Sequence, residues 1–111
     1  MMILYVTRDL MLGSRVKSHA QELGVELHLQ PQLPDAHNLD PQVTRCLLDL
    51  ETCKESLASW LEALGDRRAT LQLVGYAPHV QESTLAAATL LGLNQVMTRG
   101  QFNHAVEELL S

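Results

Sequence analysis

The stretch Arg45-Cys46-Leu47-Leu48-Asp49 decides the fold class of this chain. It is a short apolar run that ends in a carboxylate, and such runs are typical of strands that are buried on both faces of a sheet. A helical pattern follows, because apolar residues recur at the spacing of one helix face from Leu57 to Leu64 and Gly65 ends the pattern. A buried strand followed by an amphipathic helix predicts a parallel sheet with helices packed against it.

The same alternation of strand and helix extends in both directions from this unit. Strands are predicted at residues 3–6, 25–29, 71–74 and 94–97, and helices at residues 13–24, 81–91 and 102–110. Residues 30–42 break the pattern, because Pro31, Pro34 and Pro41 leave room for at most one or two helical turns. Five strands that alternate with helices predict a doubly wound α/β fold, in which ligands and chemistry collect at the carboxyl ends of the strands.

Composition limits the classes of function. The chain has 111 residues, the length of one domain, and 46 % of them are hydrophobic, so disorder is not expected. The 8 Lys and Arg residues against 13 Asp and Glu residues give a net charge of −5, which argues against binding to nucleic acid. No apolar stretch is long enough to span a bilayer and no signal peptide is recognised, so we expect a cytoplasmic protein without membrane contact. Cys46 and Cys53 fit no redox or metal motif, and the five histidines are scattered along the chain.

Polar clusters follow four of the predicted strands and should therefore meet at one edge of the sheet. Thr7, Arg8 and Asp9 follow the first strand, and Asp49 with Glu51 follows the third. The other two clusters come after the fourth and fifth strands and are Gly75-Tyr76-Ala77 with His79, and Thr98-Arg99-Gly100-Gln101. We expect the four clusters to surround one shallow cleft. A strand-terminal carboxylate can also simply cap nearby backbone amides, and arginines at such an edge can simply be solvated.

The order of these features resembles the receiver domain of two-component response regulators over the whole chain. An acid ends the third strand in Leu47-Leu48-Asp49-Leu50, small residues follow the fourth strand, and Thr98-Arg99-Gly100-Gln101-Phe102 places a basic and then an aromatic residue after the fifth. The resemblance implies one receiver-like domain over residues 1–111. It also implies a flavodoxin-like (CheY-like) five-stranded parallel sheet in the order 2-1-3-4-5, with a short or degraded second helix, in a protein of a two-component or phosphorelay system.

In a working receiver, an acidic pair follows the first strand and an aspartate on the third strand accepts the phosphoryl group. A Thr or Ser closes the fourth strand, a Lys-Pro pair closes the fifth, and the carboxylates hold Mg²⁺. Carried over to this chain, the acceptor position falls on Asp49, and the acidic pair becomes Thr7-Arg8 with Asp9 displaced by one residue. The hydroxyl position falls on Gly75 or Tyr76, and Arg99 replaces the lysine without a following proline. The resemblance thus implies a receiver whose phosphorylation site is largely lost.

The chemistry of the substituted positions leads to the same expectation. Phosphoryl transfer to a carboxylate needs a divalent cation to neutralise the charge that develops on the oxygens. Asp9 and Asp49, helped by Glu51, could ligate Mg²⁺, but a guanidinium at Arg8 would compete with the ion for the same place. We therefore expect no metal and no cofactor, and an ion pair from Arg8, Arg99 or both to Asp49 that holds the site in one state.

Together these features predict a signalling module that is not an enzyme and that acts through protein–protein contacts. Its partner would be a histidine kinase or another signalling protein, or a second copy of the chain in a two-fold dimer. The expected contact surface covers the last two helices and the strand between them, around Leu85, Leu90, Gln95, Phe102 and His104.

Two alternatives stay open at this point. The first is a functional receiver that accepts a phosphoryl group on Asp49 with the help of Mg²⁺. The second is a small-anion binder or enzyme of flavodoxin-like fold, in which Arg8, Tyr76 and Arg99 together hold the ligand.

Overall fold

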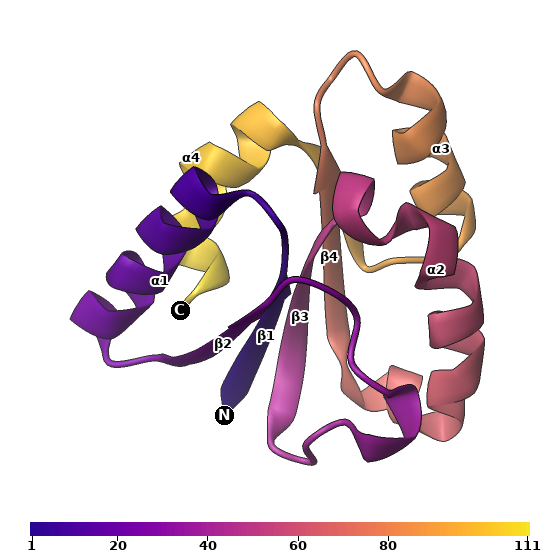
Figure 1. Ribbon diagram of the computed structural model, residues 1–111, viewed down its shortest axis with the longest axis horizontal. Coiled ribbons are helices and arrows are strands. Elements are labelled where there is room, and N and C mark those ends of the chain that lie inside the picture. The colour runs from indigo at the N-terminus through magenta and orange to yellow at the C-terminus, as the bar shows by residue number, and fades with distance from the viewer.

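The computed structural model describes residues 1–111 and is built around a sheet of five parallel strands (Figure 1). The strand order across the sheet is β2-β1-β3-β4-β5, which confirms the predicted flavodoxin-like topology. The strands are β1 (Met2–Val6), β2 (Glu26–Gln30), β3 (Val43–Asp49), β4 (Gln72–Ala77) and β5 (Gln95–Thr98).

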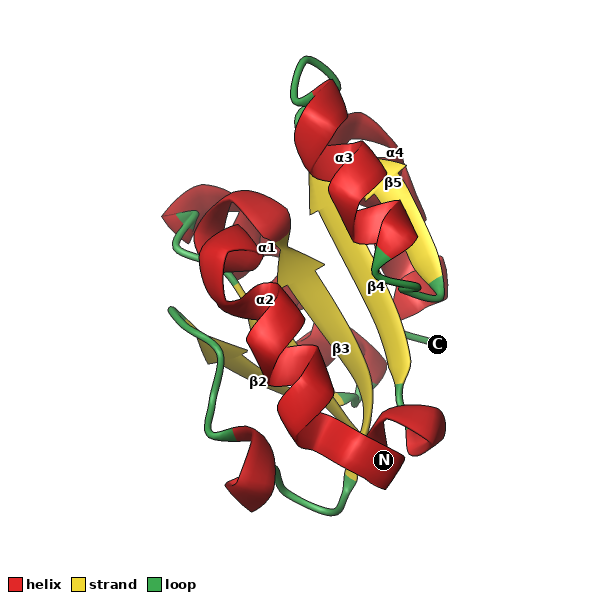
Figure 2. Ribbon diagram, turned by 90° about the vertical axis from the view of Figure 1, so that its right-hand side faces the viewer, coloured by secondary structure: helices red, strands yellow, loops and turns green.

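Four α-helices cover the two faces of this sheet, with α1 and α4 on one face and α2 and α3 on the other (Figure 1). Figure 2 views the face that carries α2 and α3 and shows α4 behind it. None of the helices combines the length and the apolarity needed to cross a lipid bilayer. The helices are α1 (Leu10–Leu23), α2 (Leu50–Leu64), α3 (Glu82–Leu90) and α4 (Arg99–Leu109).

The central strand β3 divides the hydrophobic core into two parts, because its side chains alternate between the faces of the sheet. Cys46 and Leu48 belong to the core beneath α2 and α3, which also contains Leu57 and Trp60 of α2. Leu47 belongs to the core beneath α1 and α4. Both faces of β3 are therefore buried from Cys46 onward, and this part of the strand is apolar up to its last residue, Asp49.

The register of the sheet places the ends of three strands side by side. Val6, the last residue of β1, lies opposite Leu48 of β3. Asp49, the last residue of β3, lies opposite Tyr76 of β4. The strands end at the upper edge of the sheet in Figure 1, where α1, α2 and α4 begin. Polar residues that follow β1 and β3 are thereby brought together.

The segment between β2 and β3 contains no α-helix. Its only helical element is a 3₁₀ turn at Ala36–Asn38, which agrees with the expectation of a short or degraded second helix. Arg67, in the 3₁₀ segment that follows α2, fastens this segment by donating hydrogen bonds to the backbone carbonyls of Asp40 (2.9 Å) and Val43 (2.7 Å). The indole of Trp60 donates a further hydrogen bond of 2.9 Å to the carbonyl of Pro34. Side chains from α2 and from the 3₁₀ segment after it thus hold this irregular segment against the rest of the fold.

Candidate functional site

The polar site at the strand ends is centred on one short hydrogen bond. The hydroxyl of Thr7 donates to Oδ2 of Asp49 over 2.6 Å. Thr7 directly follows β1 and Asp49 ends β3, so the sheet register brings them together from 42 positions apart in the sequence. Thr7 is 5 % exposed and Asp49 is 8 % exposed, so the contact is shielded from water. A hydrogen bond from a hydroxyl to a buried carboxylate is among the stronger polar contacts in proteins.

The remaining polar atoms of this pair also have partners. Oδ1 of Asp49 accepts the backbone N–H of Glu51 over 3.1 Å, and Asp49 is the N-cap residue of α2. The hydroxyl of Thr7 accepts the backbone N–H of Asp9 over 3.0 Å while it donates to Asp49. Asp49 therefore caps backbone amides, which was one of the roles predicted for it from the sequence. The hydrogen bond from Thr7 was not predicted.

The expected ion pair between an arginine and Asp49 is not formed. Arg99, the first residue of α4, pairs instead with Oδ2 of Asp9. Oδ1 of the same carboxylate accepts the backbone N–H of Leu12 over 3.0 Å, so Asp9 caps α1. The cap also explains why α1 begins at Leu10 and not at the predicted Gly13. The Asp9–Arg99 pair links the first turns of α1 and α4.

Arg8 also lies away from Asp49. Its guanidinium donates to the carbonyl of Pro31 over 3.2 Å, and its backbone N–H donates to the hydroxyl of Thr52 over 3.2 Å. The side chain is exposed and reaches toward the segment after β2. The guanidinium of Arg8 therefore does not take the place of a cation at Asp49, as was expected. The neutral hydroxyl of Thr7 contacts that carboxylate instead.

The fourth strand was predicted at residues 71–74, but β4 continues to Ala77. This changes the role of Gly75 and Tyr76. Gly75 and Tyr76 lie inside β4, and Ala77 is its last residue. The residue that closes the fourth strand is thus Ala77, which has no hydroxyl. Only glycine fits at position 75 of the strand. A Cβ there would lie 2.8 Å from a methyl carbon of Leu93 and 3.0 Å from one of Leu50.

Tyr76 is a core residue and does not face the cleft. Its hydroxyl lies 2.7 Å from that of Tyr5, and its ring stacks on Phe102 with a centroid distance of 4.0 Å. Burial raises the pKa of Tyr5 to about 12 and also raises the pKa of Tyr76, so both phenols are neutral in the folded chain. The three-residue ligand grip of Arg8, Tyr76 and Arg99 is therefore not assembled.

The carboxylates at this edge already have partners within the chain. Mg²⁺ takes oxygen ligands in near-ideal octahedral geometry, usually one or two carboxylates together with water molecules. Both oxygens of Asp49 accept hydrogen bonds, and both oxygens of Asp9 have partners in Leu12 and Arg99. No group of three or more His, Cys, Asp or Glu side chains is placed to hold a metal ion anywhere in the chain. Glu51 contributes its backbone N–H to Asp49 and is exposed.

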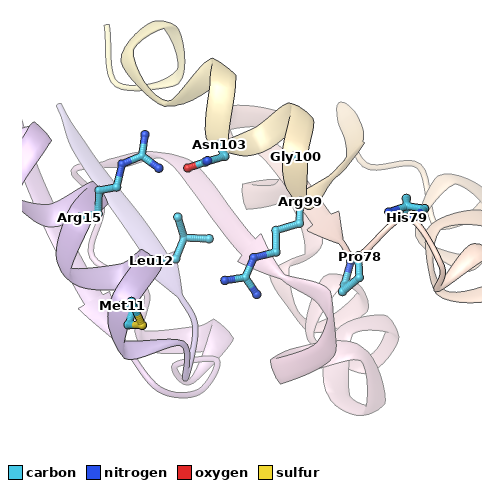
Figure 3. Close-up of a pocket in the computed structure, with 8 residues that line it drawn as sticks. All are labelled: Met11, Leu12, Arg15, Pro78, His79, Arg99, Gly100 and Asn103. Atoms are coloured by element: carbon cyan, nitrogen blue, oxygen red, sulfur yellow. The ribbon is translucent and has the colours of Figure 1, made fainter.

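A groove lies beside the Asp9–Arg99 pair, between α1 and α4. Its volume is about 480 Å³. Arg15 and Asn103 face one another across it, and Arg99 extends from α4 toward α1 (Figure 3). The residues that line this α1–α4 groove are Met11, Leu12, Arg15, Pro78, His79, Arg99, Gly100 and Asn103. Arg99 and His79 were predicted at this edge of the sheet, whereas the contribution of α1 was not.

The expected contact surface on α3, β5 and α4 is only partly accessible. Phe102 is completely buried between Tyr5 and Tyr76, so it cannot contact a partner. Leu85 is half-buried and packs against the core beneath α2 and α3. Leu90 is 88 % exposed, and Gln95 and His104 are also exposed. The error for Phe102 arises because an aromatic residue at helical spacing shows which face it occupies only once the helix is docked.

Comparisons with known proteins show the fold. No family model matches the chain, and no curated protein is similar to it. Among solved structures, a CheY-like receiver domain protein from Methanospirillum hungatei is similar with a TM-score of 0.72 and 14 % identity, over 98 % of this chain and 92 % of that one. A response regulator from Burkholderia pseudomallei, which carries a phosphorylated aspartic acid, has a TM-score of 0.74 and 12 % identity, over 99 % and 66 % of the two chains. The beryllofluoride-activated receiver domain dimer of NtrC4 has a TM-score of 0.70 and 12 % identity, over 99 % and 98 %. The fold of this chain is that of response-regulator receiver domains.

Proposed function

We propose that the chain is a non-enzymatic signalling module with a receiver fold, which acts through protein contacts and is not switched by Mg²⁺-dependent phosphorylation. The observation that carries this proposal is the buried hydrogen bond of 2.6 Å from Thr7 to Asp49. Asp49 ends β3, which is where receivers carry their acceptor, and the hydroxyl of Thr7 already donates to one of its two carboxylate oxygens.

Three features of the site oppose phosphoryl transfer to Asp49. The carboxylate is buried, so a donor has little access to its oxygens. Negative charge developing on the transferred group needs a cation, and the nearby arginines are engaged elsewhere, Arg8 with Pro31 and Arg99 with Asp9. The last residue of β4, Ala77, offers no hydroxyl to the phosphoryl oxygens. A site of this kind stays in one state.

A module that does not switch at its acceptor must transmit a signal by binding. Receiver folds present several helix faces, and the neighbouring NtrC4 receiver is described as a dimer. We therefore propose a protein partner for this chain, a histidine kinase or another signalling protein, or a second copy of the chain. The net charge of −5 disfavours nucleic acid as the partner.

Intact-mass spectrometry after incubation with acetyl phosphate and Mg²⁺ tests the loss of the acceptor. A working receiver domain in the same reaction serves as the positive control. We expect the control to gain one phosphoryl group and this chain to gain none. A phosphoryl group on the wild-type chain that disappears in Asp49→Asn would overturn the proposal and establish the functional receiver instead.

A further inference from the structure

Strand β2 forms one edge of the sheet, and its outer side is unpaired (Figure 1). It pairs only with β1, and the carbonyl of Gln30 accepts the N–H of Thr7, so Gln30 directs its backbone groups toward β1. The backbone groups of successive strand residues point to opposite sides, so Leu27 and Leu29 direct theirs outward. Within the chain, neither leucine has a backbone hydrogen bond on that side. Two N–H and two C=O groups are therefore open to a further strand.

The devices that usually protect an edge strand are missing from β2. Such strands are commonly blocked by prolines, lysines or bulges. Residues 26–30 contain no Pro, Lys or Arg, and their register with β1 is continuous. The only ionisable side chains of the strand, Glu26 and His28, contact each other over 2.9 Å. The opposite edge strand, β5, has four residues, and the N–H of its last residue, Thr98, is taken by Oε1 of Gln101 over 2.9 Å. Of the two edges, β2 thus offers the longer run of free backbone groups.

A second copy of the chain fits this edge in one antiparallel register. A two-fold axis through His28 places Leu27 of each copy opposite Leu29 of the other. Each of these two pairs exchanges two N–H to C=O hydrogen bonds, so the four bonds use every free group of both strands. The same register places Glu26 of each copy opposite Gln30 of the other, so no two carboxylates face one another. The strand is therefore self-complementary in its backbone, its apolar side chains and its charge.

We infer that β2 pairs with β2 of a second copy in this register, so that the sheets of the two copies join into one continuous sheet. This inference deepens the proposed function by naming the partner as a second copy and the surface as the outer edge of β2, and it rests on that proposal. It moves the contact surface away from the one predicted around Leu90 and His104. Pairing here needs no phosphoryl group on Asp49, because the fold already presents the free backbone groups.

Disulfide trapping tests both the surface and the register. In the inferred dimer, position 28 of one copy faces position 28 of the other at a non-hydrogen-bonded site of the ladder. The Cα atoms at such a site lie about 4.5 Å apart, which a disulfide can span. The full chain carrying His28→Cys is oxidised mildly in dilute solution, and its mass is read from a non-reducing denaturing gel. The side chain of His28 is half-exposed and the native thiols of Cys46 and Cys53 are buried, so neither the fold nor the native cysteines interfere.

Two kinds of matched control are available. Gln30→Cys lies on the same face of the same strand, but the register separates its two copies by about 14 Å along the strand. The same holds for Glu26→Cys, whereas a mixture of the Gln30→Cys and Glu26→Cys chains places one thiol opposite the other. Gln95→Cys puts an exposed thiol on β5 and reports on the surface formed by α3, β5 and α4.

We expect His28→Cys to double in mass on oxidation, and Gln30→Cys, Glu26→Cys and Gln95→Cys each to stay monomeric when oxidised alone. The mixture of Gln30→Cys and Glu26→Cys should give the linked dimer. Efficient linking of Gln95→Cys alone would assign the dimer to the surface of α3, β5 and α4 and overturn the inference. Equal linking at all four positions would show random collision and would also overturn it. A monomeric His28→Cys chain would do the same.

The two proposals can fail separately. Phosphorylation of Asp49 in a chain that still links through position 28 would refute the closed acceptor site and leave the β2 dimer standing. An unphosphorylated chain that does not link there would refute the β2 dimer alone.

Discussion

Replacement of Thr7 by valine should lower the free energy of unfolding, because it removes the hydrogen bond from Thr7 to Asp49. Thr7→Val keeps the shape of the side chain and removes only the hydroxyl, which donates to Asp49 over 2.6 Å and accepts the N–H of Asp9 over 3.0 Å. A hydrogen bond to a charged group contributes about 1.5–3 kcal/mol, and Asp49 keeps its second partner in the N–H of Glu51. We therefore expect a loss of about 2 kcal/mol in the free energy of unfolding.

Urea unfolding followed by circular dichroism at neutral pH measures this loss. Thr44→Val is the matched control, because Thr44 also lies in or beside a strand but is exposed and its hydroxyl makes no hydrogen bond. The control should stay within about 0.5 kcal/mol of wild type. If both variants are equally stable, the buried contact does not hold Asp49, and the reason for regarding the acceptor site as closed is lost.

A double-mutant cycle with Asp49→Asn isolates the charge-assisted part of the contact. Asparagine retains an acceptor for the α2 cap but carries no charge, and a hydrogen bond to a neutral group contributes about 1 kcal/mol. Thr7→Val should thus cost about 1 kcal/mol less in the Asp49→Asn background than in wild type. An identical cost in both backgrounds would mean that the charge of Asp49 plays no part.

Three further perturbations test other parts of the structure. Gly75→Ala should lower the free energy of unfolding by about 1–3 kcal/mol, because the added carbon meets side chains 2.8 and 3.0 Å away. Gly100→Ala, in open space on α4, should raise it by about 0.5–1 kcal/mol. Equal effects in urea unfolding would contradict the tight packing of β4. Arg67→Gln should lower the free energy of unfolding by about 2 kcal/mol and speed amide hydrogen exchange in residues 36–42. Arg67→Lys should restore little of this stability, because one ammonium group cannot reach the same carbonyls. Burial raises the pKa of Tyr5 from 10.0 to about 12 and raises that of Tyr76, so the stabilisation from neutral phenols is complete below pH 10 and is lost as the pH rises toward 12. Tyrosinate absorbance should therefore appear together with the loss of circular dichroism, and its appearance in a still-folded chain would show that the tyrosines are accessible.

The main features of the fold could be predicted from local patterns. The run at residues 45–49 is apolar without interruption until its final aspartate, and a strand of that kind needs cover on both faces. The prolines between residues 31 and 41 exclude a long helix wherever the chain is placed, and the structure has only the 3₁₀ turn Ala36–Asn38 there. Such features depend on residues that are close in sequence, so no tertiary information is required.

The errors in the predicted site have a common cause, because each depends on contacts across the sheet. Gly75 was interpreted as a turn residue, although Leu93 and Leu50 leave no room for a side chain there and so require glycine in the interior of the strand. An ion pair from Arg8, Arg99 or both to Asp49 was predicted, but Arg99 pairs with Asp9, the N-cap residue of α1, and Arg8 makes no such pair. Phe102 was placed on the surface, and docking of α4 buries it against Tyr5 and Tyr76.

By itself, the sequence determined that Asp49 stands at the end of a buried central strand, because strand and helix periodicities are properties of neighbouring residues. Only the tertiary structure decided what Asp49 contacts. Thr7 is 42 residues away in the sequence, and the parallel register of β1 and β3 alone brings its hydroxyl to 2.6 Å from the carboxylate. The range of a hydrogen bond is a few ångströms, so its partner is fixed by packing and cannot be read from the order of residues.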